Sequence, residues 1–272
     1  MRNKILSIIA LASCMAVSAQ ETCFIKGYIA DNQLADGKVL KKVYLNCTDE
    51  FGQVQTVASA KVKKGSYAFK CQLNQGDPVM QYTITGFSEG EGITLFVEPG
   101  EILVNTSSAT QLELSTVSGT VTNDAYAAYK AIAQHGEAEV ARQIDELKAL
   151  NGAAWLESAE GKREVKRIRA KETIKVEAEN IRFLIEHNAS PMTPWAIEHT
   201  LFSKLSAAYA EQMTKTIDVS LRTHPYYYSL RNTMLASTLK AGTEAPDITL
   251  PLVSGEVKHL TDYRGKHVIL NF

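Results

Sequence analysis

The sequence predicts an α+β protein, with an N-terminal antiparallel β-sandwich over residues 20–118, a central helical segment over 119–239 and further strands over 240–272. Two observations predict this division. Short apolar runs recur at intervals of about ten residues through the first part, which is the spacing typical of a sandwich or barrel. From about Asn123 onward the chain is rich in Ala, Glu and Lys, and its apolar residues follow helical spacing.

Seven strands are expected in the first part. The alternation is clearest over residues 66–73, where Tyr67, Phe69, Cys71 and Leu73 are separated by Ala, Lys and Gln. One face of such a strand is buried and the other is exposed to solvent, as in an antiparallel sheet. Turn-forming residues separate the strands. The expected strands cover residues 23–30, 41–47, 54–62, 66–73, 79–85, 93–98 and 102–106.

Four helices are expected in the central segment. The first begins at Asn123–Asp124, where a polar cap and a negative charge suit the positive end of the helix dipole. Its apolar stripe is interrupted at Gly136, and it ends at Asn151–Gly152. A second covers about 155–187. Two prolines open the others, at Thr193–Pro194 and at Pro225, because proline is favoured at the first helical position.

The charge balance bears on the kind of partner. The formal net charge is −1, which argues against a nucleic-acid partner because phosphate binding requires concentrated positive charge. Residues 160–172 form the most basic stretch. Acidic residues interleave with the basic ones there, so the stretch is expected to be a solvated helix face.

The N-terminus has the features of an export signal over residues 1–19. Arg2 and Lys4 precede an apolar run over 5–12, which is too short to span a bilayer. Small residues before Gln20 suit cleavage after Ala19. Alternatively, residues 11–14 resemble a bacterial lipobox, which would place a lipid on Cys14. The expected location is the periplasm or cell envelope, with contact to the inner or outer membrane only if Cys14 is lipidated.

Export would place the remaining cysteines in an oxidising compartment, where disulfides can form. Cleavage after Ala19 leaves Cys23, Cys47 and Cys71, an odd number that allows one internal disulfide at most. Cys47 and Cys71 both end strand-like runs and are the predicted pair in an oxidising compartment. The alternative is that all three are small buried hydrophobic residues. No CxxC motif occurs in the sequence.

No catalytic, cofactor-binding or metal-ligating residue is predicted, and no cofactor. Glu198–His199 lacks a second histidine at the HExxH spacing. The run Tyr226–Tyr228 is expected to pack the last helix against its neighbours, with some hydroxyls reaching water. No serine lies in a G-x-S-x-G turn. The helical region is therefore expected to be a linker or docking element.

Residues 240–272 carry a resemblance to a known family. The stretches "GTEAPDITLP" and "SGEVKHLTDYRGKHVILNF" resemble the opening of the thioredoxin-like domain in envelope thiol–disulfide oxidoreductases of the TlpA/ResA type. The alkyl hydroperoxide reductase/thiol-specific antioxidant (AhpC/TSA) family begins similarly. The positions that carry the resemblance are Gly242, Ala245, Pro246, Asp247, Gly255, Leu260, Tyr263, Gly265, Lys266 and Phe272.

The region before it resembles what precedes such domains in Bacteroidetes proteins. There, an N-terminal β-module of unknown function, the DUF4369 type, leads into helices and then into a thioredoxin-like domain. "FIKGYI", "SYAFK", "LFVEPGEILV" and "VSGTVTNDAYAAYK" stand where that pattern places them. This part of the resemblance implies no catalytic residue.

The resemblance implies thiol–disulfide exchange with protein thiols and disulfides as partners. Residues 268–272, an apolar run followed by Asn271 and Phe272, are expected to form a fully buried strand. In that family, a strand ending like this one leads into a W-C-x-x-C loop. Here we expect a fragment that stops before the redox cysteines and is inactive as it stands. The alternatives are a non-enzymatic envelope module that binds a partner, and a peroxiredoxin-like antioxidant protein.

Overall fold

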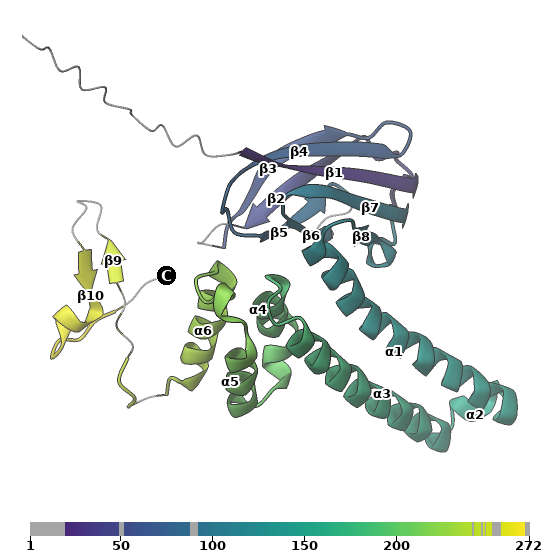
Figure 1. Cartoon of the computed structure of the whole chain (residues 1–272). Coiled ribbons are helices and arrows are strands. Elements are labelled where there is room, and N and C mark those ends of the chain that lie inside the picture. Colours follow the sequence, from purple (N-terminus) through teal and green to yellow (C-terminus); the bar gives the residue numbers. More distant parts are fainter. Residues whose placement is uncertain are drawn as a thin grey trace, which may run out of the picture.

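The computed structural model describes residues 20–48, 52–87, 92–240, 242–245, 247, 249–251 and 257–269. It is a mixed α+β structure with two sheets in its N-terminal part and helices after them (Figure 1). The expected leader over residues 1–19, with Cys14, lies outside the described residues.

Two four-stranded sheets form the N-terminal part. Their strand orders are β4-β1-β7-β8 and β3-β2-β5-β6. All seven expected strands are present, together with a short eighth strand that the sequence pattern did not indicate. The bounds are β1 Gln20–Asp31, β2 Lys42–Thr48, β3 Val54–Lys61, β4 Ser66–Asn74, β5 Met80–Thr85, β6 Ile93–Val97, β7 Gly100–Ser108 and β8 Thr116–Ser118.

One strand pairing differs from the prediction of a wholly antiparallel sandwich. β1 pairs with β4 antiparallel but with β7 in parallel, with Ile25 opposite Ile102. Both residues are fully buried. Parallel strands require a crossover rather than a hairpin, and here the chain passes through the second sheet between β4 and β7. Side chains from the inner faces of both sheets form one continuous core.

A helical hairpin extends from the sheets (Figure 1). α1, Val121–Asn151, runs outward, the short α2, Ala153–Leu156, lies at the tip, and α3, Ala159–Glu186, returns. α1 ends as expected, because Gly152 takes a φ of 83° that favours glycine. Its start differs from the prediction, since Thr120 precedes its first turn and Asn123 lies inside the helix.

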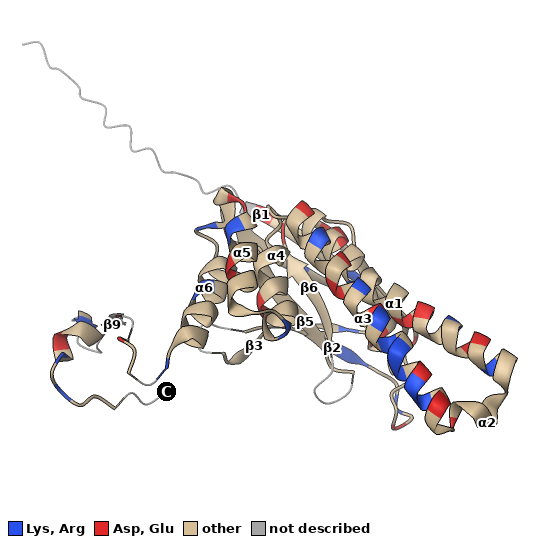
Figure 2. Cartoon of the chain, turned by 90° about the horizontal axis from the view of Figure 1, so that it is seen from below, with Lys and Arg blue, Asp and Glu red and all other residues tan. Residues whose placement is uncertain are grey.

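The expected interruption at Gly136 is instead a close approach between α1 and α3. Gly136 is buried, and a Cβ atom there would lie 2.3 Å from Cγ2 of Val176. Glycine thus lets the two helices come together at this level. Lys, Arg, Asp and Glu residues occur along both helices (Figure 2). Most charged residues of 160–172 are exposed, as expected, although Glu172 is buried.

The remaining helices are short and pack together. α4, Met192–Ala196, continues into a π-helical turn, Ile197–Leu201, and a 3₁₀ turn, Phe202–Lys204. α5, Ala207–Thr216, was not expected, whereas α6, Pro225–Thr238, begins at the predicted proline. Thr193 does not cap a helix as predicted, because it lies within α4 and its hydroxyl donates to the carbonyl of His187 at 2.6 Å.

The helices share a second core with one strand. Phe96 of β6 is fully buried among helical residues. Its ring meets those of Tyr126 and Trp195 edge to face, at centroid distances of 5.3 and 5.4 Å. Such pairs are a favoured aromatic geometry.

The last described segment holds a small antiparallel pair, β9, Thr249–Pro251, and β10, Val257–His259, followed by a 3₁₀ turn, Leu260–Tyr263. The expected buried strand over 268–272 is wrong for its first two residues: Val268 and Ile269 are outside any strand, and Ile269 is 94% exposed. Residues 270–272 lie outside the described residues.

Candidate functional site

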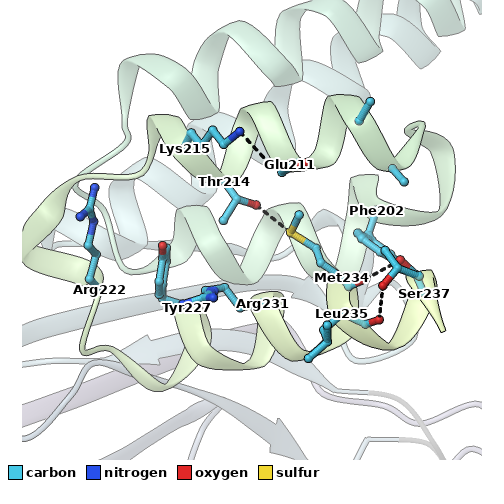
Figure 3. A pocket seen from close by; sticks show the side chains of 13 residues that line it. Phe202, Glu211, Thr214, Lys215, Arg222, Tyr227, Arg231, Met234, Leu235 and Ser237 are labelled. Carbon is cyan, nitrogen blue, oxygen red and sulfur yellow. Dashed lines mark hydrogen bonds and ion pairs between the residues drawn. The ribbon is translucent and has the colours of Figure 1, made fainter. Parts of the chain in front are cut away.

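A spacious pocket lies between α5 and α6 (Figure 3). Local capping explains why both helices begin where they do. Ser206 accepts a hydrogen bond from the backbone N–H of Tyr209 at 3.3 Å at the start of α5. His224 Nδ1 accepts from the backbone N–H of Tyr226 at 3.2 Å at the start of α6, and Pro225 suits the first turn.

The pocket has a volume of about 700 Å³, within the range of sites that take drug-sized ligands. Its two ends differ in chemistry. Arg222, Tyr227 and Arg231 lie toward one end, and Phe202 and Leu235 toward the other (Figure 3). The full lining is Phe202, Ala207, Ala208, Glu211, Thr214, Lys215, Arg222, Tyr227, Arg231, Met234, Leu235, Ser237 and Thr238.

The charged groups of the pocket are mostly positive. Lys215 pairs with Glu211 at 2.8 Å, one helical turn away, and this hydrogen bond lowers the pKa of Glu211. Arg222 acts on a nearby carboxylate, because its charge contributes to the lowered pKa of Asp218, behind the hydrogen bonds from Ser220. Arg222 and Arg231 both line the pocket, and the planar fork of a guanidinium group matches a carboxylate or a phosphate.

The wall of the pocket is fixed by internal contacts. The hydroxyl of Thr214 donates to the carbonyl of Ala210 at 2.9 Å and lies 3.0 Å from Sδ of Met234. The hydroxyl of Ser237 donates to the carbonyl of Met234 at 2.7 Å. These hydroxyls are thus turned to their own backbone, and the surface that they leave at this end is mainly apolar.

The side chains that line the pocket are basic, hydroxyl-bearing and apolar groups together with the one carboxylate of Glu211. The pocket lining contains no histidine or cysteine. Among the described residues, no group of three or more His, Cys, Asp or Glu side chains is placed to hold a metal ion.

The residues weighed from the sequence lie elsewhere. Glu198 accepts hydrogen bonds from Ser229 at 2.9 Å and Thr233 at 2.6 Å, and so ties the π-helical turn to α6. His199 stacks on Trp195, with ring centroids 5.0 Å apart. Glu198 thus joins two helices, whereas His199 packs within its own helical segment.

The tyrosine run divides among three environments. Tyr226 is buried and its hydroxyl receives the backbone N–H of Gln81 on β5. Tyr227 lines the pocket, and Tyr228 is exposed. Packing of the last helix was expected, but the pocket was not, because α5 was missing from the predicted elements. Ser206 followed by alanines was the signal for that helix.

The cysteines are free thiols in this structure: Cys23 is buried, and Cys47 and Cys71 are half-buried. Cys47 lies on β2 and Cys71 on β4, strands of different sheets. Burial raises the pKa of Cys23 to about 11, with a further contribution from Cys71, and burial also raises the pKa of Cys71. A raised pKa leaves a smaller thiolate fraction at neutral pH, so these thiols react more slowly than an exposed cysteine.

The segment that resembles an oxidoreductase opening has its own contacts. Asp247 accepts a hydrogen bond from the backbone N–H of Thr261 at 3.0 Å and lies 3.1 Å from Nδ1 of His259. The Thr261 N–H is the main cause of a lowered pKa at Asp247. Asp247 therefore ties the start of the segment to its 3₁₀ turn.

The architecture defines a class: a β-module of two packed sheets joined to a helical region that carries a pocket. Residues 24–126 match the family model described as "Domain of unknown function (DUF4369)", which spans the β-module and the start of α1. No curated protein and no solved structure matches the chain. Within the described residues, no helix is both long and apolar enough to cross a membrane.

Proposed function

We propose that this chain is a non-enzymatic binding module of the periplasm or cell envelope. In this proposal the pocket between α5 and α6 takes a ligand with an apolar body and an anionic group. The observation that carries the proposal is the division of the pocket, with Arg222 and Arg231 at one end and Phe202 and Leu235 at the other. Hydrogen bonds to charged groups are worth about 1.5–3 kcal/mol each.

A pair of probes tests the proposal. Decanoate and 1-decanol share an apolar chain and differ in charge at the head. Binding of each to the full chain is measured by displacement of a fluorescent apolar dye. We expect decanoate to bind about tenfold more tightly than decanol, because only the carboxylate is received by the arginines.

A double variant assigns the site. Arg222→Gln with Arg231→Gln should weaken decanoate binding about tenfold and leave decanol binding unchanged. Arg163→Gln is the matched control, since Arg163 is exposed on α3 and does not line the pocket. Equal binding of the two probes, or unchanged decanoate binding in the double variant, would show that the pocket is not an anion site.

A second function is favoured by the contacts of residues 240–269. Asp247, His259 and Thr261 hold this segment together, and its residue order resembles the opening of a thioredoxin-like domain. We propose that the chain is related to envelope thiol–disulfide oxidoreductases, with protein thiols and disulfides as partners. A peroxiredoxin-like relationship shares the same opening.

Two measurements test this second proposal. The 272-residue chain should show no turnover in an insulin-reduction assay, because its sequence contains no CxxC motif. The intact mass of the protein captured from its own cells, with an antibody to the β-module, decides the relationship. A longer chain with CxxC supports an oxidoreductase, whereas one with a lone cysteine in a P-x-x-x-T/S-x-x-C frame supports a peroxidase. A mass that leaves no room for redox cysteines contradicts both.

A further inference from the structure

Two of the three described cysteines face each other across a pair of strands. In the antiparallel pairing of β1 with β4, Cys23 is directly opposite Cys71. The backbone N–H of Ile29 donates to the carbonyl of Gly65 at 2.8 Å, so residues 29 and 65 form a hydrogen-bonded pair. Because such pairs recur every second residue, Cys23 and Cys71 also form one.

This position places the two residues within reach of a disulfide. Cα atoms in a hydrogen-bonded pair are about 5.5 Å apart, and disulfides join Cα atoms about 4.4–6.8 Å apart. The side chains also share a face of the sheet. Ile25 and Phe69, two residues further along each strand, are buried in the core between the sheets, and side chains alternate with a period of two.

Cys47 lies differently. It is on β2 in the other sheet, where its partners across the strands are Gln55 and Tyr82. All three cysteines act on Tyr82, since its pKa is raised first by burial and then by the charges of Cys47, Cys71, Asp77 and Cys23. The three thiols therefore gather around one tyrosine, but only Cys23 and Cys71 are directly opposed.

We propose that Cys23 and Cys71 form a reversible cross-strand disulfide by exchange with an external disulfide. Cys71 attacks that disulfide as a thiolate, forms a mixed disulfide and releases one thiolate. Cys23 then attacks the sulfur of Cys71, passes its proton to the second leaving thiolate, and closes the bond. Two protein thiols are oxidised and one external disulfide is reduced to two thiols, so atoms and electrons balance.

The geometry explains both the order of attack and the reversibility. Cys23 is fully buried whereas Cys71 is half-buried, so the external disulfide meets Cys71 first. Cβ atoms of a directly opposed pair are about 4.5–5.5 Å apart, at the longer end for a hydrogen-bonded pair. A disulfide brings them to about 3.5–4.5 Å. The two strands must therefore move closer together for the disulfide to form, which strains the bond. A strained disulfide is easier to reduce.

Disulfide mapping of the folded full chain tests the proposal. Cys14 shares a tryptic peptide with Cys23, so the chain carries Cys14→Ser. It is incubated with glutathione disulfide, its remaining thiols are alkylated, and its peptides are identified by mass spectrometry. We expect a peptide that links Cys23 to Cys71, an alkylated Cys47, and loss of the link after dithiothreitol.

Variants and a thermal readout complete the test. Cys47→Ala should still form the link, and its Tm should rise by about 5 °C on oxidation because the bond closes a long loop. Cys71→Ala should show no such rise. A link that includes Cys47, or thiols that react only after unfolding in urea, would overturn the proposal. Mapping of the chain that retains all three cysteines decides the question even if a variant fails to fold.

Discussion

The β-module and the helical region are held together in different ways. In the β-module, strands distant in sequence pair with one another, and the inner faces of two sheets share one core. In the helical hairpin, many polar contacts are local, such as Arg142 with Glu139 and Glu146 on α1 and Arg167 with Glu164 on α3. Exposed pairs of this kind add little stability.

The two candidate sites are divided between these regions. The pocket between α5 and α6 belongs to the helical region, whereas the thiols of Cys23, Cys47 and Cys71 lie in the β-module.

The two regions are joined at the edge of a sheet. β6 is the last strand in its sheet order, and unpaired edges invite association. Asn123 of α1 covers this edge, because its side chain accepts from the N–H of Phe96 at 2.9 Å and donates to the carbonyl of Phe96 at 2.7 Å. Glu98 meanwhile accepts from the N–H of Thr122 at 2.8 Å. The strand and the helix therefore stabilise each other's ends.

The largest expected effect comes from removing the aromatic ring at this junction. Phe96→Ala should lower the free energy of unfolding by about 3–5 kcal/mol, because a large buried side chain is replaced by a cavity. Urea unfolding followed by tryptophan fluorescence reports on the helical region, where both tryptophans lie. Circular dichroism reports on the whole chain.

The matched control for that variant is Phe24→Ala, since Phe24 is 42% exposed on β1. It should cost less than about 1.5 kcal/mol. Equal losses in the two variants would contradict the view that Phe96 unites the two regions.

Removing the polar half of the junction should have the next largest effect. Phe96 and Asn123 are both fully buried. Asn123→Ala therefore leaves the backbone N–H and C=O of Phe96 without their hydrogen-bond partner. We expect a loss of about 2–4 kcal/mol in urea unfolding. Asn151→Ala, at the exposed far end of α1, should cost less than about 1 kcal/mol. A cost at position 123 no larger than at 151 would mean that the edge of β6 is satisfied in another way.

A smaller effect is expected within the helical hairpin. Gly136→Ala gains up to about 1 kcal/mol of helix propensity but forces a methyl group against Val176, which costs about 1–3 kcal/mol. We expect a net loss of about 1 kcal/mol in thermal or urea unfolding. In a Val176→Ala background the same change should be stabilising. A destabilising effect in both backgrounds would show that Val176 is not the obstacle.

The smallest effect concerns pH at the other junction, where α6 meets β5. Burial lowers the pKa of His224, while the Val79 backbone acts to raise it. The unfolded chain therefore binds the proton more readily, and the stability from neutral His224 is full above about pH 6.5. It is lost as the pH falls through the lower pKa of the folded chain.

Urea unfolding at several pH values measures this contribution, which we expect to be about 1 kcal/mol or less. His224→Asn keeps a capping side chain but has no charge to gain. The difference between the two proteins should therefore be constant above about pH 6.5, and the chain with His224 should lose stability relative to the variant as the pH falls below that value. A constant difference at every pH would show that His224 does not titrate within this range.

Much of the fold was predictable because its signals are local. The alternation around Phe69 matched β4, and the glycine at 152 marked the end of α1. Asn123 was misread as a helix cap, since a polar residue near a helix start has that role more often than any other. Its actual partner, Phe96, lies in a strand from another part of the chain. The pocket was missed for a similar reason, because its lining residues come together only when α5 and α6 pack.

By itself, the sequence indicated most of the strands and helices, with β8 and α5 as exceptions, and neither its charge nor its motifs pointed to nucleic acid or a metal. Those properties depend on residues within a few positions of one another, through side-chain periodicity, capping and turn formation. Only the tertiary structure decided that β1 lies parallel to β7, that Cys71 faces Cys23 rather than Cys47, and that two arginines share a pocket. Strand register and helix packing join residues far apart in the chain, and their partners are selected by burial of the whole core.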